Sequence, residues 1–120
     1  MAAPRDPRIT LEQMLEAIQD IEQVTAGRSF EAYATDRPLR RLVERCIEIV
    51  SEASRRLPRA LKASHPQIPW QKVAAIGNIL RHDYDAVNDA TIWHAATVDI
   101  LPLKAALASL LHELDREERR

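Results

Sequence analysis

The sequence predicts an all-α protein, an up-and-down four-helix bundle whose last helix is kinked at a proline. Apolar residues recur at three- and four-residue spacing along four long segments joined by short connections, as in packed amphipathic helices. Only 2 glycines and 4% aromatic residues favour helix over sheet. With 120 residues, 46% hydrophobic and 29% charged, we expect one soluble domain over residues 1–120, with residues 1–8 and 116–120 frayed.

We expect the first long helix to begin at Thr10, whose side chain can cap it together with Gln13 three residues later. The helix should end at Gly27, a residue typical of helix C-termini. A short helical turn follows, from which Phe30 and Tyr33 would pack under the first helix. The apolar residues that direct this helix to the core are Leu11, Leu15, Ile18, Ile21 and Val24.

The second long helix is predicted between two prolines. Asp36 can cap it, and Pro38 stands in its first turn, where the missing amide hydrogen costs little. The helix should end at Leu57, because Pro58 disfavours helical backbone in the residue before it. Cys46, the only cysteine, falls on the apolar side of this helix, so we expect a buried thiol and no internal disulfide.

Four cations follow one another around the end of the second helix: Arg55, Arg56, Arg59 and Lys62. They are either a solvated face, which the helix dipole favours near a C-terminus, or a patch that contacts phosphate groups. We favour the solvated face. The net charge of −1, from 17 basic and 18 acidic residues, gives no overall electrostatic reason to expect nucleic acid.

The third long helix is predicted from Trp70 to Tyr84. Gly77 inside it costs about 1 kcal/mol relative to alanine, so it indicates that another helix approaches closely, either in the same bundle or across a dimer interface. Because four helices cannot bury every apolar residue nearby, such as Ile76, Ile79 and Trp93, we expect a homodimer that packs through the third and last helices.

The last helix is expected from about residue 90 to 118, capped by Asn88 or Asp89. Pro102 lies inside it, lacks an amide hydrogen and would clash with the carbonyl of Val98. The helix should therefore kink or break near this proline. No window of the sequence approaches a membrane-spanning segment and residues 1–7 do not resemble a signal peptide, so we expect a cytoplasmic protein.

The third helix ends in the polar run Arg81-His82-Asp83-Tyr84. Asn78 precedes His82 by four residues and shares its side of the helix. A cation, an imidazole that titrates near neutral pH and a phenol hydroxyl thus fall within about one turn, which makes this run the candidate site. The alternatives are a histidine that only caps the helix and a tyrosine that only packs its ring at the end of the bundle.

The motif Asn78-x-Leu80-x-His82-x-Tyr84, preceded by Ile68-Pro69-Trp70, resembles the HepT-like family of the HEPN superfamily, from about residue 9 to 114. The resemblance implies a HEPN-like helical bundle and a homodimer that cleaves RNA without a metal. His82 would be the general acid/base, and an arginine would neutralise charge on the phosphate. Family members carry that arginine most often directly before the asparagine, where this chain has Gly77. Arg81 is the candidate replacement, although we expect it to point well away from the direction of residue 77.

The resemblance also implies a toxin–antitoxin pair. In HepT–MntA pairs a partner nucleotidyltransferase, the antitoxin, attaches AMP to the tyrosine of His-x-Tyr, here Tyr84, and silences the toxin. Asn78 and Asp83 are the neighbouring binding candidates. The remaining histidines, His65, His94 and His112, show no metal-ligand spacing, and no glycine-rich phosphate loop occurs, so we expect neither metal nor cofactor.

Two other functions remain open at this point. The chain could be a non-catalytic subunit that binds RNA or nucleotide, or that docks the antitoxin, with Gly77 recording the loss of nuclease activity. It could also be a structural helical module whose polar run only caps a helix. RNA cleavage by the purified protein separates the first hypothesis from both of these.

Overall fold

The computed structural model describes residues 6–82 and 88–119, with the backbone alone at His82. These residues form no strand, so the all-α prediction is confirmed. The helices are α1 (Pro7–Thr25), α2 (Phe30–Ala34), α3 (Arg37–Arg56), α4 (Arg59–Ala63), α5 (Trp70–His82), α6 (Asp89–His94), the π-helical turn η2 (Ala95–Asp99) and α7 (Ile100–Glu118).

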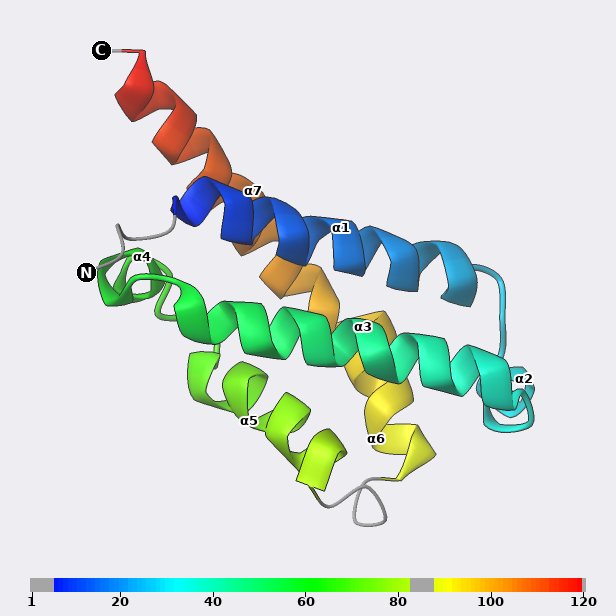
Figure 1. Cartoon of the computed structure of the whole chain (residues 1–120). Helices are drawn as coiled ribbons and strands as arrows, with labels where there is room; N and C mark the ends of the chain where they lie inside the picture. Colours follow the sequence, from blue (N-terminus) through cyan, green and yellow to red (C-terminus); the bar gives the residue numbers. More distant parts are fainter. Residues whose placement is uncertain (1–5, 83–87, 120) are drawn as a thin grey trace.

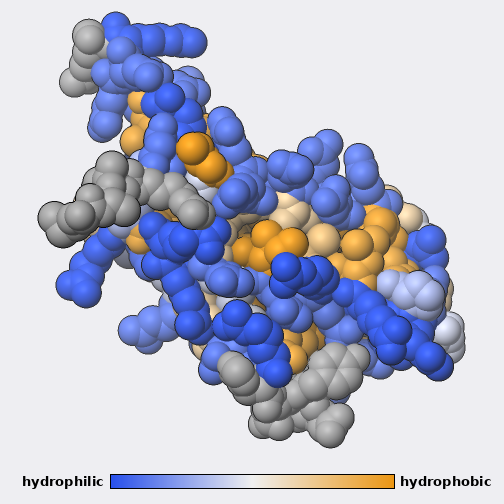
Figure 2. Space-filling model, in the orientation of Figure 1, coloured by the Kyte–Doolittle hydropathy of each residue, from blue (hydrophilic) through white to orange (hydrophobic). Residues whose placement is uncertain are grey.

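Four long helical segments make up a bundle. Helix α1 packs on α3 and α7, and α3 also packs on α5 (Figure 1). Seen from the side in Figure 2, hydrophilic side chains cover the outer surfaces, and hydrophobic ones show between α1 and α3. The fully buried side chains that fill the core include Leu11, Met14, Ile18, Ile21, Val43, Leu107 and Leu110. The predicted helical bundle is therefore confirmed.

Helix α1 begins three residues before the predicted start. The Asp6 carboxylate accepts a hydrogen bond from the amide of Arg8 at 3.0 Å, and Pro7 occupies the first turn. Thr10, the expected cap, is instead buried inside the helix. The C-terminal prediction is confirmed, because Gly27 follows the end of α1 with φ of +72°, a conformation that favours glycine.

Helix α2 lies directly before the cap of α3. Asp36 caps α3 as expected, and its carboxylate accepts a hydrogen bond from the Leu39 amide at 3.0 Å. Tyr33 is fully buried, and its ring lies against Trp93 with a centroid distance of 5.1 Å. Helix α2 therefore joins α3 to α6. The Cys46 thiol is buried as predicted, and this burial raises its pKa.

The last helical segment runs from Asp89 to Glu118 with a π-helical turn inside it. Asn88 caps the segment through a 2.8 Å hydrogen bond from the Thr91 amide, one of the two predicted caps. The turn ends just before α7, in which Pro102 is the third residue. In a π turn the hydrogen bonds join residues five apart, where an α-helix joins residues four apart. This wider pattern fits Pro102, which cannot donate to the carbonyl four residues back. The interruption is therefore a π turn in a continuous helical segment.

By length and composition alone, the segment from Asp89 to Glu118 could cross a membrane, contrary to the expectation from the sequence. About a third of its apolar window, 33%, is buried inside the bundle. Leu103, Leu107 and Leu110 are buried, and α7 contacts α1. The segment thus serves the core of this fold, and its length alone is weak evidence of a membrane.

Ion pairs hold the two ends of the described chain together. The Arg8 guanidinium lies 3.0 Å from the Glu118 carboxylate and 3.4 Å from that of Asp115. The hydrogen bond to Glu118 raises the pKa of Arg8. Residues 116–118 accordingly continue α7, and residues 7 and 8 belong to α1.

Candidate functional site

The Ile68-Pro69-Trp70 segment anchors the start of α5. Ile68 is buried in the core. The Trp70 indole donates to the carbonyl oxygens of Lys62 at 3.0 Å and His65 at 3.1 Å. These bonds tie the first turn of α5 to the end of α4 and the loop after it. The Ile68-Pro69-Trp70 part of the motif therefore fixes the position of α5, which has Arg81 and His82 at its other end.

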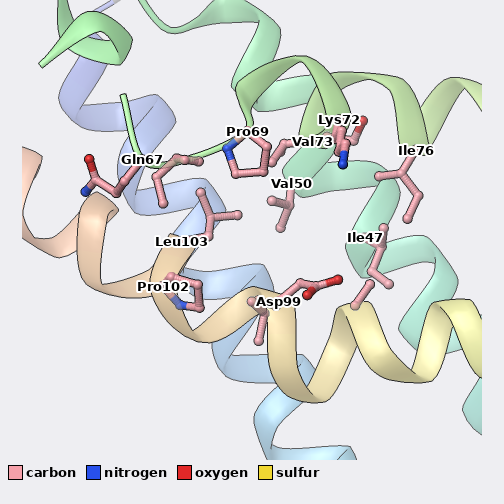
Figure 3. Close-up of a pocket in the computed structure, with 14 residues that line it drawn as sticks. Ile47, Val50, Gln67, Pro69, Lys72, Val73, Ile76, Asp99, Pro102 and Leu103 are labelled. Carbon is pink, nitrogen blue, oxygen red and sulfur yellow. The ribbon is translucent and has the colours of Figure 1, made fainter. Parts of the chain in front are cut away.

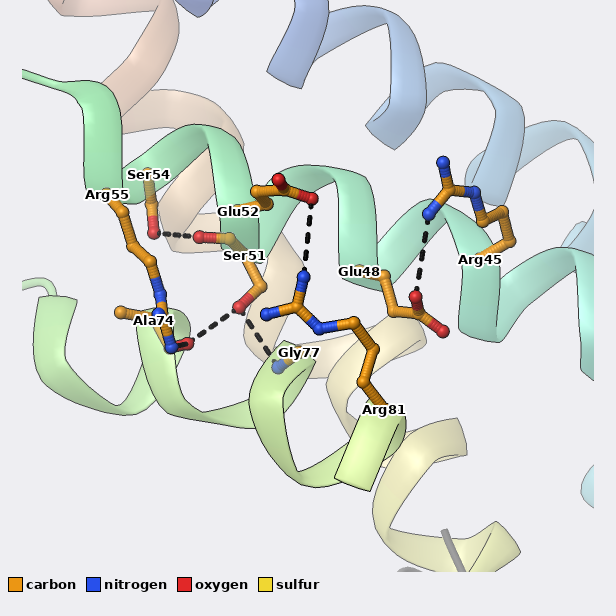
Figure 4. A network of polar contacts seen from close by, with 9 residues as sticks. All are labelled: Arg45, Glu48, Ser51, Glu52, Ser54, Arg55, Ala74, Gly77 and Arg81. Carbon is orange, nitrogen blue, oxygen red and sulfur yellow. Dashed lines mark hydrogen bonds and ion pairs between the residues drawn. The ribbon is translucent and has the colours of Figure 1, made fainter. Parts of the chain in front are cut away.

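Gly77 lies where the backbone of α5 packs directly against Ser51 of α3 (Figure 4). The Ser51 hydroxyl donates to the Ala74 carbonyl at 2.9 Å and accepts from the Gly77 amide at 3.0 Å. Arg55 donates to the same carbonyl at 2.9 Å. A Cβ at residue 77 would lie 2.5 Å from the Ser51 Oγ. Of the two predicted reasons for this glycine, the close approach within the bundle is thus confirmed.

Arg81 lies one helical turn beyond Gly77, and its guanidinium Nη1 is 3.6 Å from Oε2 of Glu52 on α3. The side chains are 37% and 52% exposed. The expectation that Arg81 points well away from the direction of residue 77 is wrong. Four helical residues advance the direction by only about 40° from a full turn. The cation of Arg81 therefore starts from the side of α5 on which the family's arginine would start.

The other predicted site residues lie at the same end of α5. Asn78 is exposed, and His82 is the last residue of the helix. Asp83 and Tyr84 lie outside the described residues. The structure therefore brings the Arg81 guanidinium and the Asn78 side chain to the exposed end of α5 where His82 stands.

Three of the four cations around the end of α3 are held by groups of this chain. Arg55 bonds the Ala74 carbonyl, Arg56 bonds the Gln13 side chain at 3.3 Å, and Lys62 bonds the Ser54 carbonyl at 3.3 Å. These bonds connect α3 to α5, α1 and α4. They weigh against a patch for phosphate groups, and they add contacts between helices that the favoured solvated face did not include.

An apolar cavity of about 320 Å³ lies between α5 and the η2–α7 segment, with α3 as its floor (Figure 3). Lys72 stands on the α5 wall, and Asp99 stands on the η2 wall. The apolar lining includes Ile47, Val50, Val73, Ile76, Ile100 and Leu103. Sequence reasoning missed this cavity, because it forms between α5 and the η2–α7 segment, which are distant in the sequence. Ile76, an apolar residue in excess of one buried stripe, was the signal for it in the sequence.

In residues 6–82 and 88–119, no group of three or more His, Cys, Asp and Glu side chains is placed to share a metal ion. The described acidic side chains nearest the site are engaged in pairs with arginine. Glu52 pairs with Arg81, and Glu48 pairs with Arg45 at 3.5 Å. The chemistry that these described groups offer is therefore that of cations and carboxylates at the surface of a helix pair.

Comparison with known proteins agrees with the motif. The model of a family described as ribonuclease HepT-like matches residues 14–110. A protein of Thermococcus cleftensis named "Probable ribonuclease HepT" is 36% identical over 83% of this chain and 91% of its own length. A protein of Caldanaerobacter subterraneus named "Putative RNase" is 30% identical over 91% of this chain and 97% of its own. No solved structure matches the chain. The chain therefore belongs to the HepT-like ribonuclease family, to which its Asn78-x-Leu80-x-His82-x-Tyr84 motif pointed.

Proposed function

We propose that the chain is a metal-independent ribonuclease in which His82 is the general acid/base and Arg81 is the cation. The observation that carries the proposal is the exposed Arg81 guanidinium, which starts on the same side of α5 as Gly77 and directly precedes His82. An imidazole can take the proton of the ribose 2′-hydroxyl as that oxygen attacks phosphorus. A protonated imidazole can give a proton to the leaving oxygen. The guanidinium stabilises the negative charge that develops on the phosphate.

The test is RNA cleavage by the purified protein. We expect His82→Ala to abolish cleavage with an unchanged helical circular dichroism spectrum, and EDTA to have no effect. His112→Ala is the matched control, since His112 is exposed on α7 and should retain full activity. Inhibition by EDTA would indicate a metal mechanism, and full activity of His82→Ala would place the cleavage elsewhere or in a contaminant.

The active form in this proposal is a homodimer in the cytoplasm. Three large apolar side chains on the helical segments that enclose the cavity are exposed: Ile79 on α5 at 42%, Val98 on η2 at 49% and Leu101 on α7 at 54%. Lys72 and Asp99 stand on opposite walls of this cavity. In a two-fold contact each copy presents the same surface, so the Lys72 of each copy can approach the Asp99 of the other. A second copy thus fits this face by both apolar area and charge.

The chain is further proposed to be the toxin of a toxin–antitoxin pair, silenced when a partner nucleotidyltransferase attaches AMP to Tyr84. This rests on the His82-x-Tyr84 motif and on membership of the HepT-like family. A phosphate group attached beside Arg81 and His82 would compete with RNA for the same cation. Asp83 is proposed to hydrogen-bond the Tyr84 hydroxyl or to take its proton as it attacks the α-phosphate of ATP. Asn78 is proposed as a neighbouring binding residue.

Intact mass spectrometry of the protein co-expressed with the nucleotidyltransferase tests this modification. We expect added adenylyl groups that disappear in Tyr84→Phe and persist in Tyr33→Phe, because Tyr33 is fully buried. An unmodified mass, or an adduct on Tyr33, would contradict the proposal.

A second candidate function is a non-catalytic subunit that binds RNA or docks the antitoxin. It is favoured by the contact at Gly77, since Ser51 leaves no room there for the arginine that family members usually carry. Binding of RNA without any cleavage, by wild type and by His82→Ala alike, would establish this function in place of the nuclease.

A further inference from the structure

Helix α5 is held on α3 in a fixed register at one point. The Ser51 hydroxyl bonds both the Ala74 carbonyl and the Gly77 amide, and Arg55 bonds the same carbonyl (Figure 4). Ser51 and Gly77 are both buried. Because the backbone of α5 touches the Ser51 side chain directly, a rotation of α5 would break these bonds or cause a clash. The direction in which residue 81 leaves the helix is therefore set from α3.

Glu52 follows Ser51 on α3, next to this contact. It pairs with Arg81, whose direction the contact sets. Its carboxylate is 3.6 Å from the Arg81 guanidinium, while Glu48, one turn earlier, is paired with Arg45. At 3.6 Å the contact is an ion pair and not a hydrogen bond, so the N–H donors of the guanidinium remain available to a phosphate. Both side chains also remain partly exposed. Arg81 is thus restrained by Glu52 and still has donors free for a phosphate.

We propose that Glu52 is a positioning residue for the ribonuclease reaction, holding the Arg81 guanidinium in the orientation in which it meets the scissile phosphate. The inference rests on the proposed function, in which Arg81 is the catalytic cation. Glu52 acts only through Arg81 and touches neither RNA nor the reacting atoms. Its carboxylate restrains a side chain that would otherwise sample many rotamers, and catalysis depends on orientation.

Glu52→Gln removes the charge and nearly preserves the shape. We expect the single-turnover cleavage rate, measured with enzyme in excess, to fall by about tenfold or more. RNA affinity, measured in a His82→Ala background, should change by less than about threefold, because Arg81 keeps its charge. Glu48→Gln is the matched control on the same helix and should leave the rate unchanged.

A double-mutant cycle separates positioning from a general structural role. If Glu52 acts through Arg81, adding Glu52→Gln to Arg81→Gln should not lower the rate further. An equal loss of rate in both backgrounds, or an unchanged rate in Glu52→Gln alone, would overturn the proposal.

A second readout does not depend on activity. In the nitrogen-15-labelled full chain without RNA, the Arg81 Nε–Hε signal should be ordered in wild type and become mobile in Glu52→Gln, but not in Glu48→Gln. An Arg81 signal that is mobile in wild type, or unchanged by Glu52→Gln, would overturn the positioning role even if the protein cleaves RNA. An ordered signal in a protein that cleaves no RNA would keep the restraint and refute the nuclease assignment.

Discussion

At residue 77 the lack of a side chain is what permits α5 to touch α3. An alanine Cβ there would lie 2.5 Å from the Ser51 Oγ and 2.7 Å from its Cβ. Rotating the hydroxyl relieves only the first contact, since the Cβ is fixed to the backbone. The site therefore reverses the usual preference for alanine over glycine in a helix.

Gly77→Ala should consequently destabilise the protein. Overpacking costs about 1–3 kcal/mol, which outweighs the gain of up to about 1 kcal/mol from helix propensity. Urea unfolding measures the difference, and Ala75→Gly is the control. Ala75 is exposed on the same helix, so there the glycine variant should be the less stable one. A Gly77→Ala protein more stable than wild type would show that α5 and α3 separate without cost.

At the scale of single elements, the start of α3 depends on one carboxylate. Asp36 accepts the hydrogen bond from the Leu39 amide and also lies 3.7 Å from the Arg28 guanidinium. The ion pair is partly exposed and contributes little, so the cap should account for most of the effect of Asp36 on stability.

We expect Asp36→Ala to lower the free energy of unfolding by about 1 kcal/mol. Asp36→Asn should lower it by much less, because asparagine keeps the acceptor and loses only the charge. Thermal or urea unfolding of both variants checks this. Equal losses in the two variants would mean that the ion pair to Arg28, and not the cap, stabilises this corner.

At the scale of the whole molecule, the proposed homodimer predicts which surface controls assembly. Ile79→Glu places a charge at an exposed apolar position of α5, so we expect monomers where wild type sediments as a dimer at micromolar concentration. Leu42→Glu is the control, because Leu42 is similarly exposed at 43% but lies on α3, outside the two helices that we expect to pack in the dimer. Wild type that sediments only as a monomer would contradict the dimer.

The sequence by itself determined the features that depend on neighbouring residues. Helical periodicity assigns the faces of α1 and α3, including the burial of Cys46, because each helix repeats its exposure every turn. The caps Asp36 and Asn88 and the turn at Gly27 also follow from local chemistry. The motif in α5 was enough to indicate the family before any contact was known.

Local rules stop where two local solutions compete. Asp6 and Thr10 can each cap a helix, and only the bundle decides for Asp6, because Thr10 is needed inside the core. Pro102 predicted a kink or a break of the last helix, and the structure has a π turn just before α7 in a continuous helical segment.

The tertiary structure alone decided what surrounds the candidate site. Ser51 and Gly77 are 26 residues apart in the sequence, and the distance between them follows from how α3 and α5 pack. The same packing brings Glu52 to Arg81 and leaves the cavity between α5 and α7. Periodicity shows which face of a helix is buried, but the partner of that face, and the atoms that meet there, depend on contacts between residues far apart in the chain.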